Sequence, residues 1–270
     1  MTDHNICTVV TAFYPIPSKI SKNIDVSQRQ YFAWTTNLFK IKAPIILFTE
    51  HHLNDKFINI RQGRPMYIVN YKFEDLISWS KYKSVWIENH KIDHEHDIHS
   101  PELYAIWAQK SVFVRDAINL NYFNTKYFMW TDIGCFRNTD HMGKLLNFPI
   151  VDHFTPNKIL FSSINELPST CDAPNGIRYV ESKNITLVGT LWGGDKQACL
   201  NWHGAYFAML DKFIEHNLFV GKDQVIMLST LLNNKDLGVV VRKTYDACDP
   251  WFFLQYLLSG HGKYSIDVSY

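Results

Sequence analysis

The chain has 270 residues, of which 46% are hydrophobic and 20% are charged, as in an ordinary globular protein. This length suits one large α/β domain. The formal net charge of +1 gives no reason to expect bulk attraction to nucleic acid or to an anionic membrane, so neither is an expected partner. Aromatic residues make up 15% of the chain, which favours pockets lined by flat side chains.

The cysteines are scattered, and none stands in C-x-x-C spacing. This pattern predicts a reduced compartment, with neither a disulfide framework nor a zinc site. The N-terminus lacks the pattern of a signal peptide, and no apolar run approaches the ~20 residues that a membrane span needs. We therefore expect a cytoplasmic protein without a transmembrane segment. The five cysteines are Cys7, Cys135, Cys171, Cys199 and Cys248.

The first hundred residues alternate short apolar runs with amphipathic stretches. This β-α-β-α-β order predicts a parallel sheet with right-handed crossovers. The sequence Ser100-Pro101-Glu102 then predicts a helix start, because it combines a capping residue, a first-turn proline and an acid near the positive helix end. Strands are expected at 6–13, 45–49 and 66–69, and helices at 25–38, 54–61 and 101–120.

Four large apolar residues, Tyr127 to Trp130, predict a strand that is buried on both faces. The run ends abruptly at Asp132 and Gly134. A central strand of an α/β sheet presents its carboxyl end to the ligand crevice, so an acid at this place indicates a functional site. The alternative is that Asp132 caps a turn, since Asp and Gly are common turn residues.

The second half of the chain has a looser pattern. The run from Thr190 to Asp195 is interpreted as a strand end that opens into a glycine pair. The histidines between His90 and His99 match neither a zinc finger nor H-E-x-x-H, so a solvated loop is expected there. Strands are expected at 159–161, 185–188 and 239–241, and helices within 196–217 and 223–232.

Several separate segments together resemble the HtrL/WlaTC (YibB-like) family, which is grouped with bacterial glycosyltransferases. The resemblance implies an α/β protein of the GT-A fold, with one Rossmann-like domain over residues 1–270 and a mostly parallel central sheet. Residues 1–137 would form the nucleotide-sugar donor half, and residues 138–270 the acceptor half and C-terminal tail. The resembling segments are Leu38–Ile41, Phe48–Glu50, Ile106–Lys110, Trp130–Arg137, Gly193–Asp195 and Lys222–Gln224.

This resemblance implies a metal-dependent transferase that moves a sugar from a nucleotide-sugar, with UDP as the expected nucleotide, to a glycan acceptor. A divalent metal, Mn²⁺ or Mg²⁺, would neutralise the leaving diphosphate. Asp132 would hold this metal, but Gly134 stands where D-x-D enzymes have a second acid. The segment Gly260–Lys263 resembles the late His-Gly-Lys segment of family 8 galactosyltransferases. It makes His261 a second metal ligand, which favours Mn²⁺, and Lys263 a phosphate contact.

The remaining expected roles concern the donor and the acceptor. The nucleotide is expected over the end of the first strand, at Thr11, Ala12, Phe13 and Tyr14. Lys110 and Arg137 are candidates for phosphate contacts. Asp223 is the expected catalytic acid, either as a general base or as a stabilising carboxylate, and its alternative is an N-cap. Gly193, Gly194 and Asp195 are expected to bind the acceptor, and their alternative is a plain turn.

Two other functions stay open at this point. One is a catalytically silent sugar- or nucleotide-binding protein of the same fold, which the missing second acid of D-x-D supports. The other is a nucleotide-sugar hydrolase that uses water as the acceptor.

Overall fold

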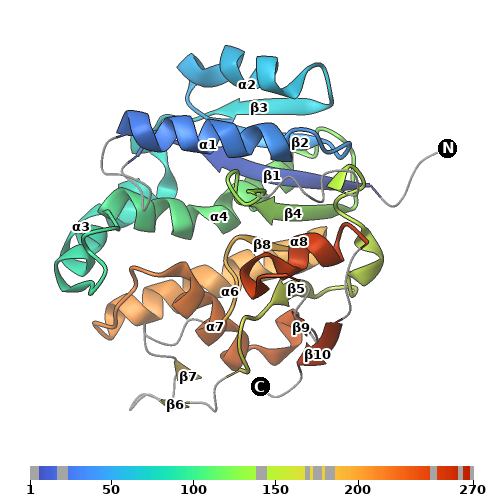
Figure 1. Cartoon of the computed structure of the whole chain (residues 1–270). Coiled ribbons are helices and arrows are strands. Elements are labelled where there is room, and N and C mark those ends of the chain that lie inside the picture. The colour runs from blue at the N-terminus through green and yellow to red at the C-terminus, as the bar shows by residue number, and fades with distance from the viewer. Residues whose placement is uncertain are drawn as a thin grey trace.

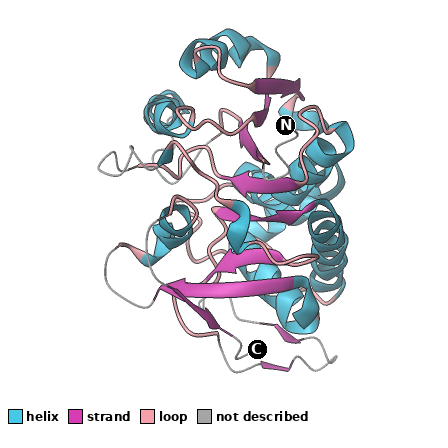
Figure 2. Ribbon diagram, turned by 90° about the vertical axis from the view of Figure 1, so that its right-hand side faces the viewer, coloured by secondary structure: helices cyan, strands magenta, loops and turns pink. Residues whose placement is uncertain are grey.

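A computed structural model of the chain shows one long sheet with helices on both sides (Figures 1 and 2). It describes residues 6–16, 24–137, 145–167, 171–172, 178–179, 186–243, 248–260 and 264–267. Among the helices of this part, none is long and apolar enough to cross a membrane.

The sheet has eight strands in the order β10-β9-β5-β8-β4-β1-β2-β3. Strands β3, β2, β1 and β4 are mutually parallel, and β5 is parallel to β9, whereas β8 runs antiparallel to both β4 and β5. The expected α/β class with a mostly parallel central sheet is therefore confirmed. The strands are β1 (Cys7–Phe13), β2 (Ile45–Thr49), β3 (Met66–Asn70), β4 (Tyr127–Thr131), β5 (Ile159–Ser162), β8 (Leu191–Asp195), β9 (Gly238–Lys243) and β10 (Tyr264–Asp267), while β6 (Cys171–Asp172) and β7 (Arg178–Tyr179) pair separately.

Alternate residues of β1, β2, β4, β5, β8 and β9 enter two different hydrophobic clusters, one on each face of the sheet. In β2, for example, Ile46 belongs to one cluster and Ile45 to the other. This alternation makes both faces apolar, so both must be covered by helices. One face packs against α3 (Ile77–Ile92), α4 (Pro101–Leu120), α6 (Lys196–Glu215) and α7 (Asp223–Asn233), and the other against α1 (Ile24–Leu38), α2 (Asn54–Arg61) and α8 (Phe253–Leu257).

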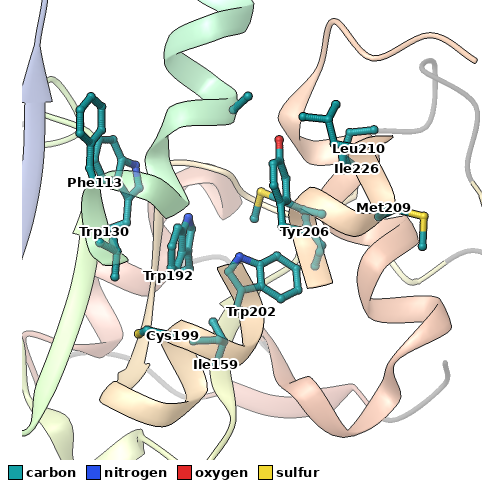
Figure 3. Packing of buried hydrophobic residues seen from close by; sticks show 14 of the residues in the cluster. Phe113, Trp130, Ile159, Trp192, Cys199, Trp202, Tyr206, Met209, Leu210 and Ile226 are labelled. Atoms are coloured by element: carbon teal, nitrogen blue, oxygen red, sulfur yellow. The ribbon is translucent and has the colours of Figure 1, made fainter. Parts of the chain in front are cut away.

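Large aromatic side chains set the position of α4 and α6 over the centre of the sheet (Figure 3). Trp130 of β4 stacks on Phe113 of α4, with ring centroids 6.0 Å apart and planes at 12°. Trp192 of β8 meets Trp202 of α6 at 6.4 Å. Such rings bury large apolar areas and leave little freedom for the helices to slide. The side chain of Lys110, on the same helix as Phe113, is thereby fixed against the end of β4.

The glycine pair of β8 lies inside the strand, so the interpretation that the strand ends at this pair was wrong, and so was its alternative of a plain turn. A Cβ atom on Gly193 would lie 2.7 Å from the carbonyl oxygen of Phe128, and one on Gly194 would lie 2.7 Å from that of Lys158. The glycines are therefore needed because neighbouring backbones approach closely, which is a packing reason rather than a turn.

Candidate functional site

A cleft opens at the edge of the sheet where β1 and β4 have their carboxyl ends. Its empty volume is about 800 Å³, the open mouth included. Strand β8 starts at the same edge, because it runs antiparallel to β4. Six aromatic rings line it, and they come from the end of β1 and the residue after it, α1, α4, β4 and the segment before α8: Phe13, Tyr14, Tyr31, Trp107, Trp130 and Phe252.

A buried ion cluster joins the floor of this cleft to the protein interior. The Lys110 ammonium lies 3.2 Å from Asp132 Oδ1 and 2.9 Å from Asp223 Oδ2. It also donates to the carbonyl oxygen of Gly189 at 2.9 Å. The three residues come from α4, from the turn after β4 and from the start of α7. The fold thus brings together three of the residues expected at the site.

Charge interactions within this cluster oppose the effect of burial. Burial by itself would lower the pKa of Lys110, but Asp132 and Asp223 outweigh it, and the pKa is raised. Burial raises the pKa of Asp132, Lys110 pulls it down, and Asp223 pushes it up, with a net rise. With both acids ionised the cluster carries one negative charge in excess. It therefore contributes no surplus positive charge to the cleft.

Lys110 has no N–H left for a ligand in this arrangement. An ammonium group has three N–H donors, and Asp132, Asp223 and Gly189 each lie within hydrogen-bond distance of it. The geometry therefore does not support the direct phosphate contact expected for Lys110. Its observed role is to hold the two carboxylates together.

Asp223 lies behind Lys110, away from the cleft wall. It is 5% exposed and does not line the cleft. A Cβ atom on Gly189 would lie 2.9 Å from Asp223 Oδ2, so only glycine leaves room for this carboxylate. The N-cap of α7 is Lys222, so Asp223 is not the N-cap that was its alternative. A direct catalytic role for Asp223 stays a prediction.

Asp132 presents at the cleft one carboxylate oxygen that is free of contacts with the described residues. Its Oδ1 accepts a hydrogen bond from the Trp130 indole N–H at 2.7 Å and faces Lys110. No described residue donates to its Oδ2. Because the Asp132 side chain is 29% exposed and lines the cleft, this oxygen is available to a ligand.

A metal site of the D-x-D kind does not fit the described side chains around Asp132. A Cβ atom on Gly134 would lie 2.7 Å from the Tyr31 ring and 3.0 Å from the Trp34 ring, so a second acid has no room there. The other nearby carboxylate, Asp223, is taken up by Lys110. The predicted ligand His261 and the predicted phosphate contact Lys263 lie outside the described residues.

The end of β1 contributes three of its four expected residues to the cleft. Ala12, Phe13 and Tyr14 line it, whereas Thr11 is fully buried and does not. The Tyr14 ring stacks on Phe113 with planes at 11°, so one of its faces is already covered. Thr11 is therefore not in a position to contact a nucleotide in this cleft.

The residues expected to bind the acceptor lie at the opposite end of β4. Asp195 pairs with Tyr127, the first residue of that strand, and Gly194 with Phe128. Asp195 is the N-cap of α6, where it accepts a hydrogen bond from the backbone N–H of Ala198 at 2.9 Å. The structure does not bring Gly193, Gly194 or Asp195 to the cleft. Their local roles are backbone packing and helix capping.

A second polar cluster lies between α3 and α4, where a solvated loop was expected. His99 is 0% exposed, and Asp93 accepts hydrogen bonds from His99 at 2.7 Å and from the Tyr104 hydroxyl at 2.5 Å. With Glu95, these residues place possible ligand atoms within 4.8 Å of one another, a spacing consistent with a divalent metal. Glu95, however, pairs with Lys222. The expectation of a solvated loop was wrong for Asp93 and His99.

Sequence reasoning missed several residues that shape the cleft. Tyr31 was expected only as part of the helix over 25–38, and Phe252 carried no signal at all. Trp107 belongs to one of the segments that resemble the family, but nothing in the sequence indicated that its ring lines the cleft. Only the assembled sheet brings residues so far apart in the chain to one edge.

Comparison with known proteins finds similarity in sequence and in structure. The chain is 23% identical over 282 residues to Protein HtrL of Escherichia coli (strain K12), covering 95% of this chain and 89% of that protein. It superposes on mouse xyloside xylosyltransferase 1, apo form, with a TM-score of 0.47, 9% identity and coverage of 87% and 84% of the two chains. With core-mannan synthase A from Aspergillus fumigatus, in its Mn/GDP form, the TM-score is 0.47, the identity 13% and the coverage 85% and 70%.

The sequence family follows from a match over most of the chain. A family model described as "Bacterial protein of unknown function (HtrL_YibB)" matches residues 5–252, which include Lys110, Asp132, Asp223 and the cleft-lining Phe252. The match ends before His261 and Lys263. The chain belongs to the HtrL_YibB family.

Proposed function

We propose that this protein is a glycosyltransferase of the GT-A type that moves a sugar from a nucleotide-sugar, with UDP as the first candidate nucleotide, to a glycan acceptor. The observation that carries the proposal is the free Asp132 carboxylate oxygen at the floor of an aromatic cleft, at the carboxyl edge of a parallel sheet. In open α/β sheets, ligands bind at this edge. Aromatic faces suit both nucleobases and sugar rings.

The proposed reaction is a displacement at the anomeric carbon of the donor sugar. An acceptor hydroxyl oxygen forms the new bond to this carbon. The bond from the carbon to the diphosphate oxygen breaks, and its electron pair stays on the nucleoside diphosphate. The hydroxyl proton passes to a base or to solvent, so the products are a glycoside and a nucleoside diphosphate.

Asp132 and Asp223 take different roles in this proposal. Asp132 Oδ2 meets the donor sugar or the incoming acceptor hydroxyl, since it is the carboxylate oxygen open to the cleft. Asp223 positions Lys110, which in turn fixes Asp132. The donor would lie mainly against residues 1–137, which supply most of the lining. The acceptor would enter from the side of residues 138–270.

A divalent metal, Mn²⁺ or Mg²⁺, remains a prediction of the resemblance. When bound, such an ion would offset charge on the diphosphate. Asp132 is its only candidate ligand among the described cleft residues, and His261 lies outside them. The roles given to the protein's own residues do not depend on the metal.

A panel of UDP- and GDP-sugars tests the proposal. We expect one donor to raise the melting temperature and to release its nucleotide faster when a glycan acceptor is added. Asp132→Asn should reduce the transfer rate at least a hundredfold, as loss of a group that stabilises a transition state does. Asp55→Asn, an exposed acid on α2, is the matched control and should have no effect.

The two alternatives give different results in the same assay. Donor binding without nucleotide release in any mixture would indicate a silent binding protein, which the absent second acid at Gly134 favours. Release at one rate with and without acceptors would indicate a hydrolase. If no donor binds in the presence or absence of Mn²⁺, the proposed function is wrong.

A further inference from the structure

Arg137 lies at the mouth of the cleft, held between two aromatic rings. Its guanidinium carbon is 4.2 Å from the centre of the Trp34 ring and 5.8 Å from that of Phe252. Its Nε donates to the carbonyl oxygen of Gly134 at 3.2 Å. These contacts orient the planar group and leave its two terminal nitrogens without a hydrogen bond to any described residue. Stacked arginines of this kind are preorganised for bidentate contacts.

Among the cleft residues that the structure describes, the charge arrangement leaves Arg137 as the cation available to a ligand. The cleft-lining charges among the described residues are Lys110, Asp132 and Arg137. The Lys110 ammonium already contacts two carboxylates and a carbonyl oxygen. Arg137, by contrast, forms no ion pair with a described carboxylate. An anion that enters this cleft is therefore attracted by Arg137 at the mouth rather than by Lys110 at the floor.

Gly134 explains how Arg137 reaches this place. The missing Cβ lets the turn after β4 pass directly under Tyr31 and Trp34 of α1, where any side chain would collide with both rings. The turn then places the Arg137 guanidinium over the Trp34 ring. The residue that removes the second acid of a D-x-D motif is thus the same residue that permits the arginine contact.

We propose that Arg137, clamped by Trp34 and Phe252, is the diphosphate-binding residue of the cleft and sets its preference for nucleoside diphosphates over nucleosides. The assignment rests on the proposed function, since it concerns the donor of that reaction. The two terminal N–H groups offer a fork that matches two phosphate oxygens. In the transfer step, the same fork meets the charge that stays on the departing diphosphate.

A ligand series on the full chain isolates the phosphate contact from the base contact. Affinities of uridine, uridine monophosphate, UDP and inorganic pyrophosphate, and of the matching guanosine compounds, are measured by calorimetry in EDTA and again in Mn²⁺. We expect Arg137→Gln to weaken diphosphate binding at least tenfold in both conditions and to leave nucleoside binding within twofold. Arg137→Lys keeps the charge but loses the fork, so it should recover only part of the affinity.

Two further variants separate binding from structure. Trp34→Leu removes one ring of the clamp and should weaken UDP but not uridine. Arg64→Gln, at the opposite edge of the sheet before β3, is the matched control and should change neither affinity. The melting temperature of unliganded Arg137→Gln should equal that of wild type, because the side chain is exposed.

The possible results distinguish a failure of the Arg137 assignment from a failure of the proposed function. If wild type binds UDP or GDP and Arg137→Gln binds it within twofold, the clamp is wrong and the proposed function stands. If uridine affinity falls as much as UDP affinity, Arg137 shapes the cleft without meeting phosphate, which also overturns the clamp. If wild type binds no nucleotide and no pyrophosphate, both proposals fail.

Discussion

Two carboxylates beside α4, the buried Asp93 and the half-buried Asp132, have opposite electrostatic environments. Asp93, near the start of the helix, accepts hydrogen bonds from the Tyr104 hydroxyl, the Glu95 backbone N–H and His99. Burial alone would raise the pKa of Asp93, but these hydrogen bonds outweigh it, and the pKa is lowered. Asp132 has the cation Lys110 beside it and still has a raised pKa, because burial and the second acid, Asp223, prevail.

The difference shows how a buried acid can be either structural or reactive. At Asp93 the donors contact both carboxylate oxygens, so the ionised form is stabilised. At Asp132 both contacts fall on one oxygen, and the competing acid shares the cation. A carboxylate that is incompletely satisfied and open to a cleft has the properties of a functional group.

The largest effect is expected from Lys110→Met. Removing the ammonium leaves Asp223 buried without a partner, which should lower the free energy of unfolding by about 3–5 kcal/mol. Urea denaturation measures this loss. The double variant Lys110→Met/Asp223→Leu should lose less than the single one, because no unpaired buried charge remains behind Asp132. A loss below about 1 kcal/mol for Lys110→Met would contradict this prediction, because exposed ion pairs on a protein surface contribute no more than that to stability.

An intermediate effect is expected from Tyr104→Phe in the Asp93 cluster. The variant removes one of the donors that satisfy Asp93, which should cost about 1–3 kcal/mol of stability. UDP affinity should stay within twofold, since neither Tyr104 nor Asp93 lines the cleft. Tyr82→Phe removes a comparable bond to Asp211, whose side chain is 43% exposed, and should cost less. Equal losses in both variants would contradict the comparison.

The smallest effects are expected in the acid dependence of stability, where the two acids should act with opposite sign. The lowered pKa of Asp93 gives stability that is present above its unfolded pKa of about 3.9 and is lost as the pH falls through the folded pKa. The raised pKa of Asp132 gives stability that is present below that value and is lost as the pH rises through the folded pKa.

Urea midpoints at a series of pH values can separate the two contributions. Asp93→Asn should flatten the dependence below the unfolded pKa, and Asp132→Asn should flatten it above that pKa. Each single proton can change the slope by at most about 1.4 kcal/mol per pH unit. A change of the same sign in both variants would show that the two environments are alike.

Much of the fold could be predicted from local sequence signals. The helix over 101–120 has the bounds expected from Ser100-Pro101-Glu102, and Ser100 does cap it by accepting from the Leu103 backbone N–H. Helix α3 was not predicted. Its exposed Ile77, Ile87 and Ile92 obscure the buried stripe formed by Trp79, Tyr82 and Trp86.

Only those residues of the candidate site that stand at the end of a predicted strand could be predicted from the sequence. Asp132 and the end of β1 follow from the rule that ligands meet the carboxyl edge of parallel strands. The direction of β8 does not follow from its sequence, because Gly193 and Gly194 suit a turn as well as a crowded strand. Once β8 runs antiparallel to β4, Asp195 must lie at the far edge. The contacts that occupy the Lys110 ammonium form between segments that are distant in the chain, and no local sequence pattern encodes them.

The Lys110 cluster also has a consequence for how the molecule comes apart. Lys110 and Asp132 belong to the first half of the chain, whereas Asp223 belongs to the second. Separating the halves breaks the Lys110–Asp223 contact together with the β4–β8 pairing, and an opening too narrow to hydrate these charges leaves them buried without partners. Native-state hydrogen exchange should therefore find β1 and β9 in one cooperative unit.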